Sequence, residues 1–154
     1  MRIHGVVWIV TEDPTTTAAL QPLGPGQGDR TRVLVVDDHA PLRRLIVEVL
    51  TEAGDIAVVG ECRDGEEVVD AFLRTRPGVV LMDVNMPGTD GIEATRRLLA
   101  VQPGARVVLL TASSGADRSE NARRLGVAGC LSKADVGALP DRVRAVASGD
   151  TAWA

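Results

Sequence analysis

Short runs of Val, Leu and Ile, separated by helix-length segments, constrain the fold of this 154-residue chain more than any other feature. The runs are VLVV (33–36), IAVVG (56–60), VVLM (79–82), VVLL (107–110) and a weaker VAGCL (127–131). Continuous runs of branched apolar residues are typical of parallel strands that are covered on both faces. Strands that alternate with helices build doubly wound sheets with right-handed crossovers. We therefore predict an α/β fold with five parallel strands and five helices.

The intervening segments have helical periodicity and capping signals. The first carries an apolar stripe at positions 42, 45, 46, 49 and 50, and the second and third open at Asp64 and Asp90. The fourth, about 116–125, offers only Ala122 and Leu125 as strong apolar anchors. We predict that this fourth helix is weakly held and easily displaced.

Domain boundaries follow from composition. Residues 1–30 are predicted to be a flexible leader, because 14–28 contain three Pro, three Gly and no sustained apolar period. Residues 31–150 form the predicted domain, and 151–154 form a C-terminal tail or the start of a linker. No apolar run approaches the roughly 20 residues of a membrane span, and no export signal is recognisable, so a cytoplasmic location is expected.

Charge and aromatic content exclude several functions. The net charge is −4, and the chain has no Tyr, one Phe and two Trp. Neither the electrostatics nor the stacking platforms for nucleic acid are present, so we expect no DNA contact from this chain. The three Arg pairs at 43–44, 96–97 and 123–124 fall in helical segments, and we interpret them as solvated helix faces.

Polar side chains follow the apolar runs at the points where ligands of open α/β sheets bind. They are Asp37 and Asp38 after the first run, Asp83 after the third, Thr111 after the fourth, and Lys133 beyond the fifth. Capping of the first helix is an alternative role for Asp38. Three clustered carboxylates repel unless a cation lies among them, and oxygen ligands favour Mg²⁺. Asp83 is then a candidate nucleophile toward phosphorus, with Thr111 and Lys133 neutralising phosphoryl oxygens.

Lys133 stands out because it is the only lysine beside 16 arginines. A compact ammonium at this strand end, in a chain that otherwise uses guanidinium groups, favours a role at the site over a leftover surface charge.

Four motifs resemble those of two-component response regulator receiver domains, also called CheY-like domains. They are VLVVDDH (33–39), LMDVNMPGTDGIEA (81–94), LLTAS (109–113) and GVAGCLSKAD (126–135). DDH and GECRDGEEVV (60–69) are most similar to the NarL/FixJ subfamily. The resemblance covers about residues 31–150 and implies a flavodoxin-like sheet of strand order 2-1-3-4-5.

The resemblance also implies roles. Asp83 would accept a phosphoryl group from a sensor histidine kinase, with Thr111 and Lys133 contacting that group. The implied Mg²⁺ ligands are Asp37 mainly through water, Asp38 directly, Asp83, and the backbone carbonyl of Asn85. Family members regulate transcription, often dimerise on phosphorylation, and catalyse only their own aspartyl phosphorylation and dephosphorylation.

Two departures from the family pattern stand near the site. Ala134 follows Lys133 where many receivers have Pro, and Cys130 occupies a position that usually holds Tyr or Phe. In the family that ring turns inward as the counterpart of Thr111 moves, so the usual coupling is altered. Two alternative functions stay open: a degenerate receiver that binds partners without phosphorylation, and a haloacid-dehalogenase-type phosphohydrolase. The latter family requires Asp-x-Asp, whereas Asp83 is followed by Val84 and Asn85.

Overall fold

The computed structural model describes residues 2–3, 6–9, 21–22, 29–112 and 116–153. Its contacts divide the chain into two units, residues 1–30 and 31–154, and each is described by itself. In the first unit, β1 (Arg2–Ile3), β2 (Val6–Ile9) and β3 (Gln21–Pro22) form an antiparallel sheet of order β1-β2-β3. Most of the predicted flexible leader, including 10–20 and 23–28, lies outside the described residues.

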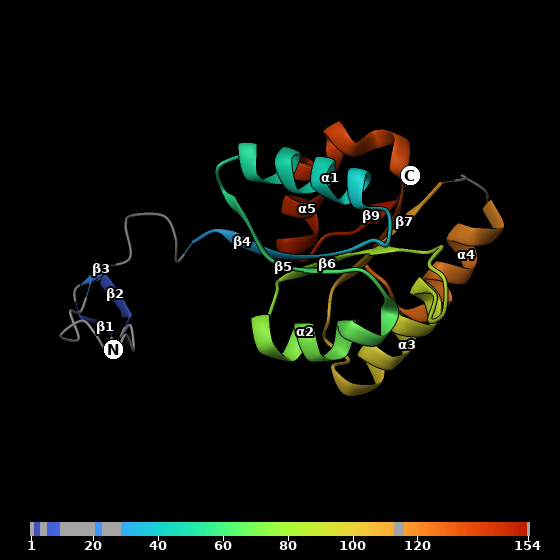
Figure 1. Cartoon of the computed structure of the whole chain (residues 1–154), viewed down its shortest axis with the longest axis horizontal. Coiled ribbons are helices and arrows are strands. Elements are labelled where there is room, and N and C mark those ends of the chain that lie inside the picture. The colour runs from blue at the N-terminus through green and yellow to red at the C-terminus, as the bar shows by residue number, and fades with distance from the viewer. Residues whose placement is uncertain (1, 4–5, 10–20, 23–28, 113–115, 154) are drawn as a thin grey trace. The chain divides into compact units, whose positions relative to one another are not determined.

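The second unit is built on a parallel sheet of order β5-β4-β6-β7-β8-β9 (Figure 1). Its strands are β4 (Thr31–Val36), β5 (Ile56–Cys62), β6 (Val79–Asp83), β7 (Val107–Thr111), β8 (Gly129–Ser132) and β9 (Ala152–Trp153). The predicted order of the first five strands is confirmed. The sixth strand was not predicted, because its two residues were assigned to the C-terminal tail.

Helices cover both faces of this sheet. They are α1 (Ala40–Glu52), α2 (Val68–Thr75), α3 (Gly91–Val101), α4 (Ala116–Leu125) and α5 (Leu139–Ala147), with short 3₁₀ turns at Gly65–Glu67 and Lys133–Ala138. Figure 1 shows α1 and α5 on one side of the sheet and α2 and α3 on the other. None of the helices in the described part of the chain is long and apolar enough to span a membrane.

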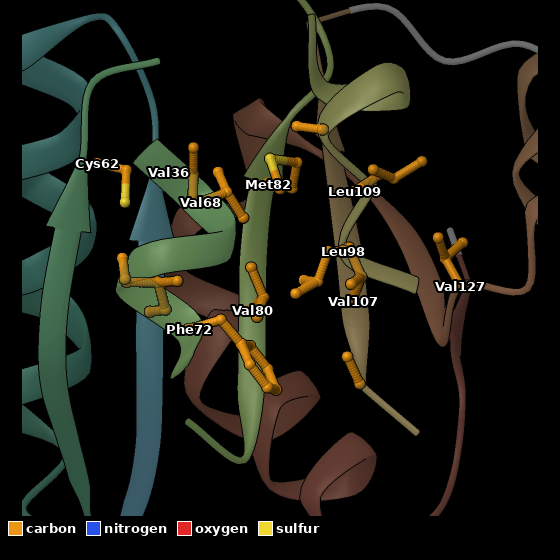
Figure 2. Packing of buried hydrophobic residues seen from close by; sticks show 14 of the residues in the cluster. Val36, Cys62, Val68, Phe72, Val80, Met82, Leu98, Val107, Leu109 and Val127 are labelled. Carbon is orange, nitrogen blue, oxygen red and sulfur yellow. The ribbon is translucent and has the colours of Figure 1, made fainter. Parts of the chain in front are cut away.

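Alternate residues of the strands feed two separate hydrophobic clusters. Leu34, Val36, Val80 and Met82 pack with α2 and α3 in one cluster (Figure 2). Val33, Val35, Val79 and Leu81 pack with α1 and α5 in the other. All five residues of β6 and of β7 are buried. The sheet is therefore a rigid support for whatever lies at its edges.

Helix starts follow their predicted signals in two places. Asp90 caps α3 by accepting a hydrogen bond from the Glu93 N–H at 2.8 Å, and Asp64 caps the turn that leads into α2. The cap of α1 is His39 rather than Asp38, since the His39 imidazole accepts from the Leu42 N–H. Asp38 is thereby left without a capping role.

On one side of the sheet the edge strand is β9, which pairs with β8. Gly129 pairs with Ala152, and a Cβ at Gly129 would lie 2.0 Å from the Ala152 carbonyl oxygen. Only glycine permits this approach of the two backbones. On the next position Cys130 pairs with Trp153, whose ring lies 4.4 Å from the Arg123 guanidinium of α4. β9 therefore connects the sheet to the helix that we predicted to be weakly held.

Candidate functional site

Neighbouring parallel strands bring the predicted residues to one edge of the sheet. Asp37 follows β4, Asp83 ends β6, Thr111 ends β7 and Lys133 follows β8. β4 pairs with β6, β6 with β7 and β7 with β8, so their carboxyl ends lie in succession. The structure thus gathers here the side chains that sequence analysis selected.

Asp83 is fully buried and receives two polar contacts on one oxygen. The Lys133 ammonium lies 2.8 Å from Asp83 Oδ1, and the Asn85 N–H donates to the same oxygen at 3.0 Å. The other oxygen, Asp83 Oδ2, is buried and has no hydrogen-bond partner among the residues that the structure describes. One oxygen of this carboxylate is therefore held by the protein, and the other is left for a proton, a cation or a reacting group.

Asp37 is equally buried and is held from its own backbone. Its Oδ1 accepts from the His39 N–H at 2.8 Å, while its Oδ2 lies 3.6 Å from Lys133 Nζ and has no hydrogen bond within the described part of the chain. A buried carboxylate oxygen without a partner is costly unless a proton or a cation satisfies it. Asp37 and Asp83 therefore each present one unsatisfied oxygen.

An exposed third carboxylate completes an acidic cluster. One oxygen from each of Asp37, Asp38 and Asp83 lies within 4.8 Å of the others. An oxygen-only donor set with two unsatisfied buried oxygens fits a hard divalent cation, and Mg²⁺ suits a site with few direct carboxylates and retained water. The residues present are thus compatible with the Mg²⁺ that sequence analysis expects.

The protonation of Asp83 reflects this crowding. Burial raises the pKa of Asp83 to about 6, and the nearby Asp37 carboxylate acts in the same direction. The Lys133 ammonium and the Asn85 N–H oppose the rise because both stabilise the ionised form. Lys133 and Asn85 therefore favour the ionised form of Asp83, which is the form that can act as a nucleophile.

Thr111 and Asn85 are placed differently. Thr111 is 4% exposed and pairs in register with Ser132, one residue before Lys133. Asn85 is exposed and lies two residues beyond Asp83. Thr111 and Asn85 both line a cavity under α4. The expected coordination by the Asn85 carbonyl stays a prediction.

Arg43 is a residue that sequence analysis missed. We interpreted the pair 43–44 as a solvated helix face, which is wrong for Arg43: the residue is buried, while Arg44 is exposed. The Arg43 guanidinium donates to the Asp37 carbonyl oxygen at 2.8 Å and to Glu61 at 3.1 Å. Its spacing of three and seven residues from the buried Ile46 and Leu50 was the available signal.

Comparison with known proteins gives consistent results. Residues 33–144 match the family described as the response regulator receiver domain. The response regulator GacA of Pseudomonas protegens is 40% identical over 119 residues, which are 77% of this chain and 56% of GacA. The chain spans about half the length of the GacA relatives that it matches.

Solved structures show the same architecture. A LuxR-family two-component response regulator from Aurantimonas sp. SI85-9A1 superposes with a TM-score of 0.76 at 31% identity, covering 80% of this chain and 89% of that one. The signal receiver domain of the response regulator NarL from Mycobacterium tuberculosis gives 0.74 at 31% identity, covering 79% and 98%.

Proposed function

The chain belongs to the response regulator receiver domain family, and on that premise we propose that it is a switch controlled by phosphorylation of Asp83. One observation supports this most directly. Asp83 is buried beside Asp37, has one unsatisfied oxygen, and is held at 2.8 Å by the only lysine of the chain. This combination supplies a nucleophile, a cation site and a counter-charge for a phosphoryl group.

We assign the cation site to Mg²⁺, with Asp37, Asp38, Asp83 and the Asn85 backbone carbonyl as its protein ligands. Bound there, Mg²⁺ would neutralise charge on the carboxylates and on the incoming phosphoryl group. The exposed position of Asp38 leaves that side of the cluster open to the ion and its water.

The chemical step is a transfer between two proteins. An oxygen of ionised Asp83 forms a bond to the phosphorus of a phosphohistidine on a sensor kinase, and the phosphorus–nitrogen bond breaks. The imidazole leaves with the electron pair of that bond and takes up a proton. Lys133 exchanges its contact with Asp83 for one with a phosphoryl oxygen, and the Thr111 hydroxyl contacts another.

The output follows from the same geometry. Thr111 lies at the end of β7 beside the cavity that α4 covers, so a change at Thr111 is transmitted toward α4. We propose that the phosphorylated chain changes its contacts with a partner or with a second copy of itself. The chemistry is confined to its own phosphorylation and dephosphorylation in the cytoplasm, and DNA contact is not part of the proposed role.

The test uses acetyl phosphate as phosphoryl donor. With Mg²⁺, intact-mass spectrometry should show one labile phosphate per chain, and the Asp83→Asn variant should show none. No adduct with acetyl phosphate or with a cognate kinase contradicts the proposal and favours a phosphorylation-independent receiver. Multiple turnover of small phosphate esters would instead favour a phosphohydrolase.

A further inference from the structure

A cavity of about 620 Å³ lies between α3, α4, β7 and β8, and the segment that follows β6 also lines it. Its volume is within the range of about 300–1,000 Å³ that is typical of small-molecule sites. Thr111 lines one end of the cavity, and the acidic cluster itself is not part of its lining. Asn85 also lines it, so the cavity adjoins the acidic cluster without containing its carboxylates.

The walls of this cavity combine apolar and polar side chains, and the charged ones have one sign. Ile92, Leu109 and Leu125 supply hydrocarbon, while Arg96 from α3 and Arg124 from α4 supply guanidinium groups. None of the described residues that line it carries a carboxylate. Both arginines pair with glutamates of their own helices, at 3.7 Å for Arg96 and 2.8 Å for Arg124.

These intrahelical pairs leave the arginines available to a ligand. In each pair both side chains are well exposed, with 63% and 46% for the first and 74% and 65% for the second. Exposed pairs of this kind contribute little to stability, because water screens both charges. A guanidinium group also has five N–H donors, so a pairing with one carboxylate does not exhaust it.

Cys130 explains why the space is open. This residue is 5% exposed and lines the cavity. It belongs to the hydrophobic cluster that packs with α2 and α3. A cysteine side chain ends after one sulfur atom, whereas an aromatic ring at this point of β8 would project toward the same volume. The departure from the family pattern thus leaves a cavity with an apolar wall.

We propose that this cavity binds a small organic anion, a molecule with an apolar ring or branched chain and one carboxylate or sulfonate group. The apolar part packs on Leu109, Leu125 and Cys130, and the anionic group contacts Arg96 and Arg124. Because Thr111 lines the same space, bound ligand also restrains the residue that contacts the phosphoryl group. Only this second effect depends on the proposed function; binding does not.

The probe for the test is 8-anilinonaphthalene-1-sulfonate, which combines two aromatic groups with one sulfonate. The folded full chain should bind it saturably, with one dye per chain, by fluorescence titration. The Arg96→Gln/Arg124→Gln variant should weaken binding about tenfold, as expected for loss of charge-assisted contacts. Cys130→Phe should also weaken it at least tenfold by filling the cavity.

Matched controls distinguish binding in this cavity from nonspecific binding of the dye. Arg97→Gln removes an exposed arginine next to Arg96 that does not line the cavity, so its dye affinity should equal that of the native chain. Asp83→Asn should also bind the dye normally, which separates this proposal from the proposed function. Uncharged N-phenyl-1-naphthylamine should show no dependence on the two arginines.

Circular dichroism melts check that each variant is folded. If Cys130→Phe is unstable, the Arg96→Gln/Arg124→Gln variant, which changes two exposed side chains, provides the test. Absence of saturable binding to the native chain, or equal affinity in the double arginine variant, overturns the proposal. If the dye is released when the chain self-associates at higher protein concentration, the proposal is also overturned. That result would assign the cavity to contact with a second copy of the chain.

Discussion

The Lys133 ammonium lies 2.8 Å from Asp83 Oδ1, so the only lysine of the chain contacts the buried candidate nucleophile. The pair comes from two strands that are not neighbours, β6 and β8, with β7 between them. Lys133 retains 18% side-chain exposure, which leaves it room to follow a phosphoryl group. This contact holds the Asp83 carboxylate, and in the proposed function Lys133 moves from it to a phosphoryl oxygen.

Replacement of Lys133 by Met should affect both chemistry and stability. Asp83 then keeps its burial but loses its nearest counter-charge, so its pKa rises further. We expect unfolding free energy to fall by about 2 kcal/mol at pH 8 and by much less at pH 5, where Asp83 is protonated. The rate of phosphorylation by acetyl phosphate should fall at least tenfold in Lys133→Met. The rate of Lys133→Arg should lie between those of Lys133→Met and the native chain. Urea melts at the two pH values and mass spectrometry check these outcomes.

The pH dependence of stability without Mg²⁺ has a defined sign. The pKa of Asp83 is raised from 3.8 to about 6 on folding, mainly by burial. Folded chains then bind more protons than unfolded ones in this window, so the stability is fully present below about pH 4 and lost as pH rises through about 6. Asp83→Asn should abolish that loss and be more stable at pH 7.5 by on the order of 2 kcal/mol.

Glu48→Gln, which alters an exposed carboxylate of α1, is the matched control and should leave the pH profile unchanged. Urea melts between pH 4 and 8 give the comparison. A native profile that is flat across pH 4–6, or the same slope in Asp83→Asn, would contradict the assignment of the raised pKa to this group.

Magnesium should stabilise the folded chain through the acidic cluster. A ligand that binds only the native state adds RT ln(1 + [L]/Kd) to the unfolding free energy, about 2.7 kcal/mol at 100 times Kd. Asp38 is exposed and caps no helix, so Asp38→Asn should leave the stability without Mg²⁺ nearly unchanged while removing most of this gain. Thermal melts with Mg²⁺ and with EDTA check it. An equal Mg²⁺ response in Asp38→Asn would remove this residue from the ligand set.

Arg43 and Arg44 form a natural pair for a mutational comparison. The buried Arg43 guanidinium joins α1 to the Asp37 carbonyl and to Glu61, whereas Arg44 is exposed. Arg43→Met removes the side-chain donor to the carbonyl of the buried Asp37, whereas the exposed Glu61 stays solvated, and should cost about 1–3 kcal/mol. Arg44→Met should stay within about 0.5 kcal/mol. Equal effects in denaturant melts would show that the contact with Asp37 contributes little.

These residues also show what sequence alone can predict. The buried strands follow from their Val and Leu runs, and Asp83 and Lys133 follow from the rule that ligands bind where parallel strands end. The spacing of Arg43 on α1 indicates its burial, but its partners could not be predicted, because Asp37 and Glu61 are brought together only by the pairing of β4 with β5. β9 was missed because a two-residue strand has no periodicity, and its place depends on the Gly129 backbone.

The contact between Trp153 and Arg123 should report movement of α4. The ring of Trp153 lies 4.4 Å from the Arg123 guanidinium and is half-buried against the cluster that contains Cys130. Cation–π contacts contribute about 0.5–1 kcal/mol at exposed sites, so a modest displacement of α4 can break this one. In a Trp8→Phe background, phosphorylation should shift the Trp153 emission spectrum. Arg123→Gln should show most of that shift beforehand, and Asp83→Asn should show none. If mass spectrometry confirms phosphorylation but the Trp153 emission spectrum does not change, displacement of α4 from Trp153 is excluded.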